Sequence, residues 1–279
     1  MITAKNLSYV YDNGAEAVVD TSFTIGPGLY LMLGENGAGK TTLLHLLSGL
    51  LYPTSGTVTI DGEDVKKRLP STLSNLFFLP EAMEIPTDTV RQFAGLHSPF
   101  YNDFSTESFG DNLTDFGLTG NENMRSLSFG TRHKSVLAYV LALGVNHLFL
   151  DEPANGLDIQ SRHRLRAMMA RTMTEDSTVI VSTHTVSDLE QLFDGVIIMH
   201  HGRVVLCDKT ENIARCLKFI TTIERPDDVL YVEHEMGLYH AIAINRDDEY
   251  SEVDFRLLYS SLFSAAAPFI ISTLNSQQL

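Results

Sequence analysis

The stretch GENGAGKT, residues 34–41, decides the fold, because it matches the pattern G-x-x-x-x-G-K-[ST] at every position. The apolar run Leu29–Leu33 before it predicts a strand, and the leucine-rich run Lys40–Leu51 after it predicts a buried helix. The glycines allow backbone N–H groups to point inward at a phosphate, and the helix N-terminus adds a partial positive charge. Lys40 can then reach the β- and γ-phosphates of a nucleotide, and the Thr41 hydroxyl can bind Mg²⁺. The nucleotide-binding residues expected in and beside this phosphate loop are Gly34, Glu35, Asn36, Gly37, Ala38, Gly39, Lys40, Thr41 and Thr42.

Two adjacent carboxylates, Asp151 and Glu152, end a second apolar run, His147–Leu150. Charges at the end of a buried strand are costly unless they are used. We therefore interpret Asp151 as the Mg²⁺-side ligand, directly or through water, and Glu152 as the general base that polarises an attacking water. The alternative is a solvated pair at a strand end. A third apolar run, Thr178–Ser182, leads to His184, which we expect to contact the γ-phosphate and orient the water.

Strands and helices alternate along the middle of the chain. The predicted elements are a helix at Lys134–Leu143, a strand at His147–Leu150, a helix at Gln160–Thr174, a strand at Thr178–Ser182, a short helix, and a strand at Val196–His200. This alternation predicts an α/β fold with a parallel sheet covered on both faces. The carboxyl ends of parallel strands line one crevice, so we expect the phosphate loop, the Asp151 carboxylate and His184 to lie together.

The segment LSFGTRHK, residues 127–134, also opens a helix. Its serine and glycine make a second anion site at a helix N-terminus, and one chain does not need two such sites for one phosphate. With Ala154–Asp158 after the carboxylate pair, this signature segment resembles that of the nucleotide-binding subunit of ABC transporters. The resemblance covers about residues 1–215 and includes, in order, the aromatic loop, Walker A, Q-loop, signature, Walker B, D-loop and switch histidine.

The resemblance implies a P-loop ABC cassette with a mainly parallel sheet, an antiparallel N-terminal β part and a helical lobe. It also implies an ATPase that uses ATP and Mg²⁺ and works as a head-to-tail dimer with two ATP molecules at the interface. The phosphate loop of one chain and the signature residues of the other would hold each ATP. These signature residues are Leu127, Ser128 and Gly130.

Two further positions carry roles that the resemblance implies. Tyr11 matches the aromatic residue that stacks on adenine, although Tyr9 lies two residues away and a packing role is open for either. Asp158 matches the D-loop residue that links the two sites across the dimer.

Three positions depart from the family pattern. Phe129 and Thr131 replace the third and fifth signature residues, and Glu81 replaces the Q-loop glutamine. A carboxylate is a good ligand for Mg²⁺ but adds negative charge beside the phosphates, and a solvated loop acid is the alternative for Glu81. Glutamate at this position is typical of bacterial exporters of drugs, antibiotic peptides or polysaccharides, so the resemblance favours that branch.

Composition excludes several classes of protein. The formal charge of −15 argues against binding to nucleic acid, because a phosphate-backbone binder needs a basic face. Cys207 and Cys216 are too few for a disulfide framework and wrongly spaced for a metal site. The N-terminus shows no secretory signal, and the apolar stretch Val136–Leu150 is shorter than the ~20 residues of a membrane span.

The chain divides into an ABC cassette at residues 1–215, with a helical lobe at about residues 81–143, and a small α+β appendage at residues 216–279. The appendage is predicted from the short strands VLYVEH and HAIAIN and a helix at Val253–Phe263. Residues 81–126 hold 8 acids and 2 bases, which suggests that this part of the lobe is a surface for a basic partner.

The leading interpretation is the ATPase subunit of a bacterial exporter. Its partners would be a separate integral membrane permease and a second ABC subunit, identical or not, and it would sit peripherally on the cytoplasmic face of the cell membrane. The alternative is an ABC ATPase that transports nothing, such as an iron–sulfur cluster assembly ATPase. The substrate pathway would lie in that permease.

Overall fold

The computed structural model describes residues 1–83, 85–184, 192–246, 249 and 251–276. Its centre is a six-stranded sheet in the order β10-β9-β3-β8-β7-β6, parallel except for β10, which pairs antiparallel with β9. The apolar runs at 29–33, 147–150 and 178–182, in the inner strands, are buried on both faces, as a parallel sheet requires. The strands are β3 (Gly28–Leu33), β6 (Leu76–Leu79), β7 (His147–Asp151), β8 (Thr178–Thr183), β9 (Gly195–His200) and β10 (Arg203–Lys209).

A second sheet, antiparallel in the order β2-β1-β4-β5, shares a hydrophobic core with one face of the central sheet and with helix α1. Its strands are β1 (Ile2–Val10), β2 (Glu16–Ile25), β4 (Ser55–Ile60) and β5 (Glu63–Asp64); α1 is Lys40–Leu47, and the short helices η1 (Val65–Lys67) and α2 (Pro70–Leu73) lead to β6. The expected antiparallel N-terminal β part is therefore confirmed.

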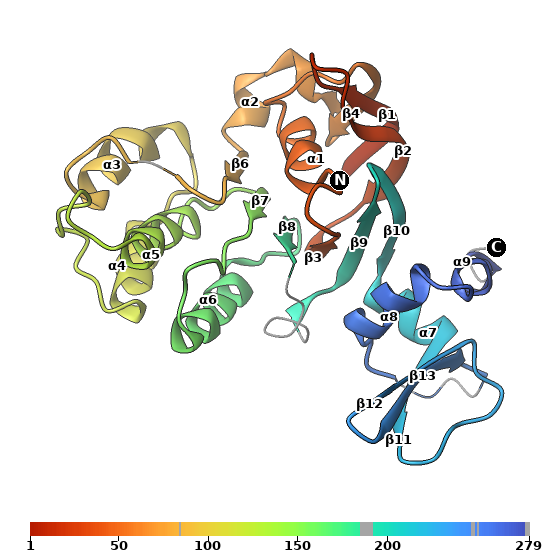
Figure 1. Cartoon of the computed structure of the whole chain (residues 1–279). Helices are drawn as coiled ribbons and strands as arrows, with labels where there is room; N and C mark the ends of the chain where they lie inside the picture. The colour runs from red at the N-terminus through yellow and green to blue at the C-terminus, as the bar shows by residue number, and fades with distance from the viewer. Residues whose placement is uncertain (84, 185–191, 247–248, 250, 277–279) are drawn as a thin grey trace.

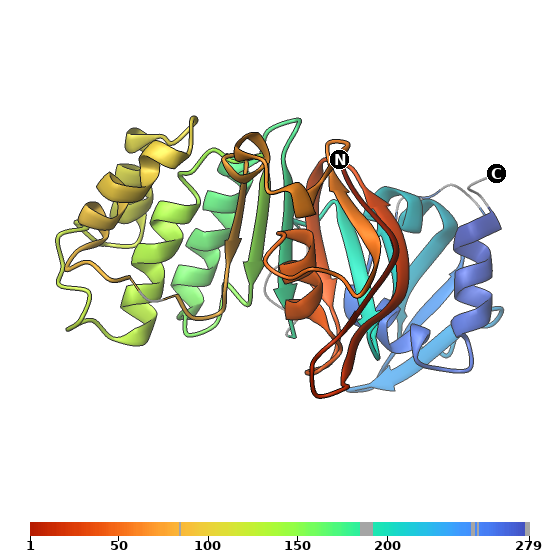
Figure 2. The ribbon, with the colours of Figure 1, turned by 90° about the horizontal axis from the view of Figure 1, so that it is seen from above.

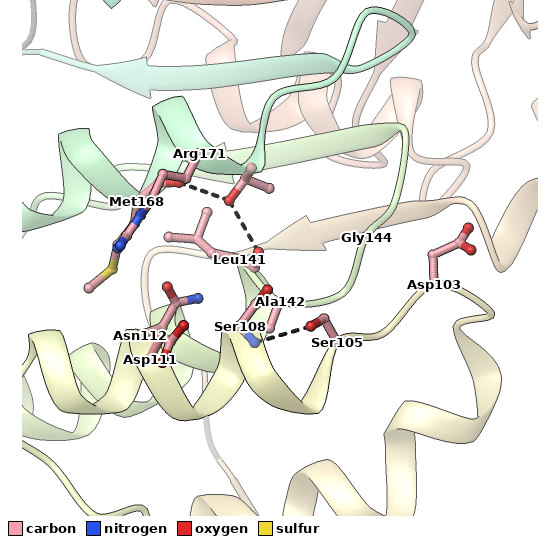
Figure 3. A pocket seen from close by; sticks show the side chains of 11 residues that line it. Asp103, Ser105, Ser108, Asp111, Asn112, Leu141, Ala142, Gly144, Met168 and Arg171 are labelled. Atoms are coloured by element: carbon pink, nitrogen blue, oxygen red, sulfur yellow. Dashed lines mark hydrogen bonds between the residues drawn. The ribbon is translucent and has the colours of Figure 1, made fainter.

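The helical lobe follows β6 and lies at one end of the molecule, while the C-terminal elements lie at the other (Figures 1 and 2). Its elements are α3 (Val90–His97), η2 (Ser98–Phe100), α4 (Thr106–Asp115) and α5 (Phe129–Val140), and α6 (Ile159–Thr172) follows β7. A cavity of about 210 Å³ opens where α4 meets the end of α6, with Asn112 and Arg171 in its lining (Figure 3).

The C-terminal elements form the expected α+β unit around a sheet in the order β11-β13-β12. Its core is continuous with that of the cassette, and the rings of Phe193 and Phe255 meet edge to face at 6.4 Å. The elements are α7 (Thr210–Cys216), β11 (Leu217–Thr222), β12 (Tyr231–Glu235), β13 (Leu238–Ile244), α8 (Phe255–Leu262) and α9 (Ala267–Ser276). Within the described residues no single helix could cross a membrane; by length and composition only the bent pair α8 and α9 could.

The largest differences from the predicted helix boundaries are in α1 and α5. The helix expected at Lys40–Leu51 ends at Leu47, because Gly49 adopts a left-handed φ of +68° and the Leu50 N–H bonds back to the His45 carbonyl. The helix given as Lys134–Leu143 spans Phe129–Val140, and its start behind the Ser128 cap agrees with the prediction that the signature segment opens a helix. The short helix expected after Ser182 falls largely in 185–191, outside the described residues.

Candidate active site

The phosphate loop joins β3 to α1 and depends on its glycines. Gly39 precedes α1 with a left-handed φ of +101°, and a Cβ there would lie 2.2 Å from the Ala17 carbonyl oxygen, so no other residue fits. Lys40 is buried, and its ammonium donates to the carbonyl oxygens of Gly34 at 2.6 Å and Glu35 at 3.3 Å. Burial lowers the pKa of Lys40, and the Glu152 and Asp151 carboxylates oppose that shift. The backbone of the phosphate loop therefore surrounds the ammonium group of Lys40.

A pocket of about 380 Å³ opens at the carboxyl edge of the central sheet, against the end of β1 and the start of β2. Tyr11 is 40% exposed, its hydroxyl is hydrogen-bonded to Thr42 at 2.8 Å, and Tyr9 packs edge-on against its ring. Gly34 and Ala38 shape the loop without lining the pocket. The expected site residues that line it are Tyr11, Glu35, Asn36, Gly37, Gly39, Lys40, Thr41, Thr42, Glu81, Asp151 and Glu152.

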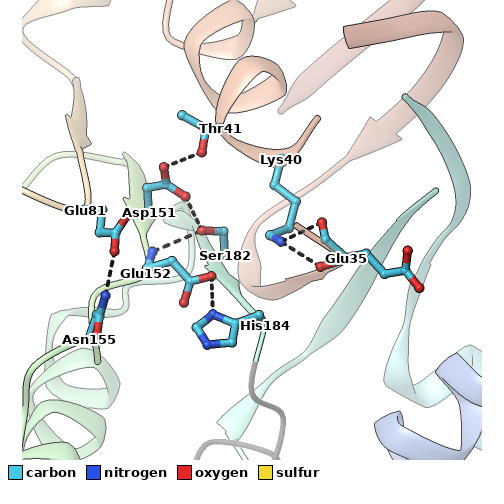
Figure 4. Close-up of polar contacts among 10 residues, drawn as sticks. Glu35, Lys40, Thr41, Glu81, Asp151, Glu152, Asn155, Ser182 and His184 are labelled. Atoms are coloured by element: carbon cyan, nitrogen blue, oxygen red, sulfur yellow. Dashed lines mark hydrogen bonds and ion pairs between the residues drawn. The ribbon is translucent and has the colours of Figure 1, made fainter. Parts of the chain in front are cut away.

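Asp151 ends β7 directly below the start of α1 (Figure 4). The Thr41 hydroxyl donates to one of its carboxylate oxygens at 2.6 Å, and the Ser182 hydroxyl donates to the other. The described residues contain no cluster of three or more His, Cys, Asp or Glu that could hold a metal. One hydroxyl and one carboxylate fit Mg²⁺, which takes few protein ligands and completes its shell with phosphate oxygens and water.

Glu152 follows the strand in a left-handed conformation, with a φ of +49°. Its carboxylate accepts a hydrogen bond from Nδ1 of His184 at 2.9 Å, and the two side chains point toward one another (Figure 4). Glu152 lines the pocket, whereas His184 does not. The glutamate side chain is largely buried and the histidine is about half exposed. A carboxylate oriented by a histidine can accept a proton from a water held between them and a phosphate.

The signature segment lies outside this pocket. Ser128 is exposed, and its hydroxyl caps α5 by accepting from the Thr131 N–H at 3.3 Å. Gly130 packs against the loop after β7, where a Cβ would lie 2.6 Å from the Gly156 carbonyl oxygen. Phe129 is 48% exposed and stacks on His133. The structure thus separates the signature residues from the phosphate loop of the same chain.

Two expected site residues are tied to neighbours within the chain. Asp158 caps α6 and pairs with Lys134 at 2.7 Å, and this pairing holds the pKa of the Asp158 carboxyl well below its usual range. Glu81 accepts a hydrogen bond from the Asn155 side chain at 2.6 Å. The D-loop at 154–158 is therefore in contact with both the Q-loop and the signature helix.

Sequence reasoning missed three polar side chains that hold the site together: Ser182, Asn155 and His133. His133 is buried, and its Nε2 lies 2.9 Å from the Pro153 carbonyl oxygen. The one signal for Ser182 was a small polar residue at the end of an otherwise apolar strand.

Known proteins match both the sequence and the fold. Residues 18–155 match the family model described as ABC transporter. The chain is 30% identical to the ABC transporter ATP-binding protein NatA of Bacillus subtilis, covering 78% of this chain and 89% of NatA. It is 34% identical to the energy-coupling factor transporter ATP-binding protein EcfA2 of Lactiplantibacillus plantarum, covering 73% of this chain and 76% of that protein.

Two solved structures share the fold. An ATP-binding subunit of an ABC transporter superposes with a TM-score of 0.68 at 24% identity, covering 77% of this chain and 92% of that one. A dimeric ATP-binding cassette bound to ADP and Pi superposes with a TM-score of 0.66 at 23% identity, covering 75% and 98%. The chain therefore belongs to the ATP-binding subunits of ABC transporters, a class of ATP-hydrolysing enzymes.

Proposed function

We propose that this chain powers export through a separate membrane permease by pairing head to tail with a second ABC subunit around two ATP molecules. The single observation that carries the pairing is that Ser128 and Gly130 lie outside the pocket formed by the phosphate loop of their own chain. A helix N-terminus with free N–H groups is an anion site. This one requires a phosphate held by another chain.

Two exposed apolar side chains next to the signature segment and the D-loop support a partner chain on this face of the molecule. Phe129 is 48% exposed and Ile159, the first residue of α6, is 76% exposed. The two positions flank the D-loop, and Phe129 lies close enough to Gly156 to exclude a Cβ there. A facing chain would remove both side chains from water, which favours association by roughly 25 cal/mol per Å² of apolar surface buried.

The site residues divide the chemistry of hydrolysis. Glu152 accepts the proton of the attacking water, and His184 orients it against the γ-phosphate. Lys40 and the backbone N–H groups of the phosphate loop neutralise the phosphate oxygens, with Tyr11 against the base. Thr41 and Asp151, with Glu81 nearby, would hold Mg²⁺, which would supply positive charge to offset the charge that develops on the phosphate oxygens.

The dimer is tested with a variant that binds ATP but hydrolyses it slowly. Glu152→Gln should shift from monomer to dimer on light scattering when MgATP is added, because the amide keeps the size of the side chain and loses only its basicity. The matched variant Glu152→Gln with Ser128→Arg should remain a monomer under the same conditions. Equal dimerisation of both variants would contradict the proposed interface.

The permease is proposed to dock on the helical lobe. Leu96 and Phe100 are 63% and 68% exposed there, and Leu96 borders an open groove of about 530 Å³ that also includes Pro86 and Arg125. The charge of residues 81–126, from 8 acids and 2 bases, suits a basic cytoplasmic segment. This would place the chain on the cytoplasmic face of the membrane. Export itself rests on Glu81 and its resemblance to exporter subunits.

Crosslinking tests the docking surface. The chain carrying a photoreactive residue at position 96 or 100 should capture a multi-span membrane protein from detergent-solubilised membranes, and identification of that protein would name the transport class. Position 236, fully exposed at the tip of the β12–β13 turn, is the matched control. Capture from position 236 alone would contradict docking on the lobe.

A further inference from the structure

We propose that Ser182 is a positioning residue for ATP hydrolysis: its hydroxyl joins the carboxylate of Asp151 to the backbone of Glu152. The inference rests on the roles proposed above for those two acids. Ser182 and Asp151 are direct neighbours in the parallel pairing of β8 and β7. Ser182 is fully buried, so water does not compete for its hydroxyl.

The directions of the hydrogen bonds are determined by their chemistry. The Ser182 hydroxyl donates to Oδ1 of Asp151, because an ionised carboxylate can only accept. Its oxygen accepts the Glu152 N–H at 3.1 Å. The Thr41 hydroxyl donates to Oδ2 of Asp151 at 2.6 Å. One continuous chain of hydrogen bonds therefore runs from the phosphate loop through Asp151 and Ser182 to the backbone of Glu152 (Figure 4).

The first consequence concerns the conformation of Glu152. A non-glycine residue with a φ of +49° is strained and persists only when its surroundings hold it. The Glu152 N–H is held by both the hydroxyl and the carbonyl oxygen of Ser182, at 3.1 and 3.2 Å. This anchor directs the Glu152 carboxylate toward His184 rather than along the strand. Loss of the hydroxyl leaves one of the two acceptors.

The second consequence concerns Asp151. With Oδ1 engaged by Ser182, Oδ2 is the oxygen that faces Thr41. Without the hydroxyl the carboxylate can rotate, and a buried acceptor loses its partner. Ser182 therefore sets which oxygen Asp151 presents to Mg²⁺. Loss of the Ser182 hydroxyl should weaken the binding of Mg²⁺ as well as slow hydrolysis.

A purely structural role is the competing explanation, and two variants separate the two. Ser182→Ala removes the hydroxyl, and Ser182→Cys keeps nearly the same volume with a much weaker donor. Ser177→Ala is the matched control, because Ser177 is also buried and its hydroxyl bonds to Thr174 just before the opposite end of β8. All three variants lose a buried serine hydroxyl, but only two of them lose it beside the acids.

Two properties are measured: the steady-state ATPase rate, and the Mg²⁺ concentration needed for the protein to bind a fluorescent ATP. The melting temperature of each variant shows whether it folds. Ser182→Ala should lower kcat about 10- to 100-fold, the scale of a hydrogen bond to a charged group, with the KM for ATP nearly unchanged. The half-saturating Mg²⁺ concentration should rise in the binding assay. Ser182→Cys should behave like Ser182→Ala at a near wild-type melting temperature, and Ser177→Ala should keep the wild-type kcat and Mg²⁺ requirement.

Wild-type kcat and Mg²⁺ dependence in Ser182→Cys would overturn the inference, and so would equal losses in Ser177→Ala. Glu152→Gln is assayed in parallel so that failures can be told apart. If Glu152→Gln loses hydrolysis while both Ser182 variants match the wild type, this inference alone fails. If Glu152→Gln keeps the wild-type rate, the proposed role of Glu152 fails, and the Mg²⁺ titration still decides whether Ser182 orients Asp151.

Discussion

The phosphate loop and the signature segment are built alike and placed differently. Each places a glycine at the N-terminus of a helix, Gly39 directly before α1 and Gly130 in the first turn of α5. The phosphate loop lines a pocket and encloses the ammonium of Lys40. Ser128 is exposed, and its hydroxyl already caps its own helix. The same local physics therefore yields one closed half-site and one open half-site.

The cations near the signature segment sharpen this difference. Arg132 donates to the carbonyl oxygens of Met124 and Leu127, and Lys134 pairs with Asp158. Both cationic side chains are therefore bound to groups of their own chain. The phosphate loop can bind an anion alone, whereas the signature segment offers neutral N–H donors to an anion that is already held elsewhere.

The largest expected effect comes from a variant that slows hydrolysis and leaves both the phosphate loop and the signature segment unchanged. Glu152→Gln should lower kcat about 10²- to 10⁴-fold, because a positioned general base is lost while both helix N-termini stay intact. Phosphate release under saturating MgATP measures it. Glu175→Gln, at an exposed position after α6, is the control and should keep the wild-type rate. A wild-type rate in Glu152→Gln would mean that another group accepts the proton.

A smaller effect distinguishes the half-sites in the monomer. Lys40→Ala should weaken ATP binding about 10- to 100-fold, because one charge-assisted contact in a partly buried loop disappears. Ser128→Arg should leave monomer affinity unchanged, since the signature segment lies outside the pocket. Calorimetry at protein concentrations below dimerisation measures both. Weakened monomer binding in Ser128→Arg would break the distinction between the two segments.

The smallest effect concerns the stability of the protein at acid pH and involves His133, a buried residue of the signature helix α5. Burial lowers the pKa of His133, while its hydrogen bond to the Pro153 carbonyl and the Glu81 charge oppose the shift. The unfolded chain, with a histidine pKa near 6.5, therefore binds protons more readily than the folded chain. The contribution of neutral, buried His133 to the free energy of unfolding is therefore fully present above that pKa and is lost as the pH falls below it.

Urea unfolding at about pH 7.5 and about pH 5.5, which bracket the unfolded histidine pKa, should show a flatter pH dependence in His133→Gln than in the wild type. His163→Gln, at an exposed position of α6, should keep the wild-type dependence. An unchanged slope in His133→Gln would mean that this histidine takes up its proton equally in both states.

Local patterns predicted what depends on local sequence. The apolar runs at 29–33, 147–150 and 178–182 predicted strands because buried parallel strands are continuously apolar, and the glycine loop determined what lies between β3 and α1. The end of α1 was missed although Gly49 carries a standard helix-ending signal, whereas the start of α5 at Ser128 was predicted. The prediction for α1 rested on its leucines and gave this glycine too little weight.

Contacts that depend on strand register or on helix packing could not be predicted from the sequence. Ser182 meets Asp151 only because β8 and β7 pair in that register, and Lys134 meets Asp158 only because α5 packs against the D-loop. Helix α9 was also missed, since Ala267–Ser276 has no clear polar face. The roles of the site residues stay predictions until variants are measured.

The central claim is that a complete site takes its phosphate loop from one chain and its signature segment from another. Phosphate release is the measurement, on Lys40→Ala and Ser128→Arg chains separately and mixed in equal amounts. Each variant alone forms no intact site and should be nearly inactive. The mixture should recover part of the wild-type rate, up to about half, because only mixed dimers hold an intact site and each holds one of two. Phosphate release from the mixture no faster than the average of the two separate variants would contradict the account.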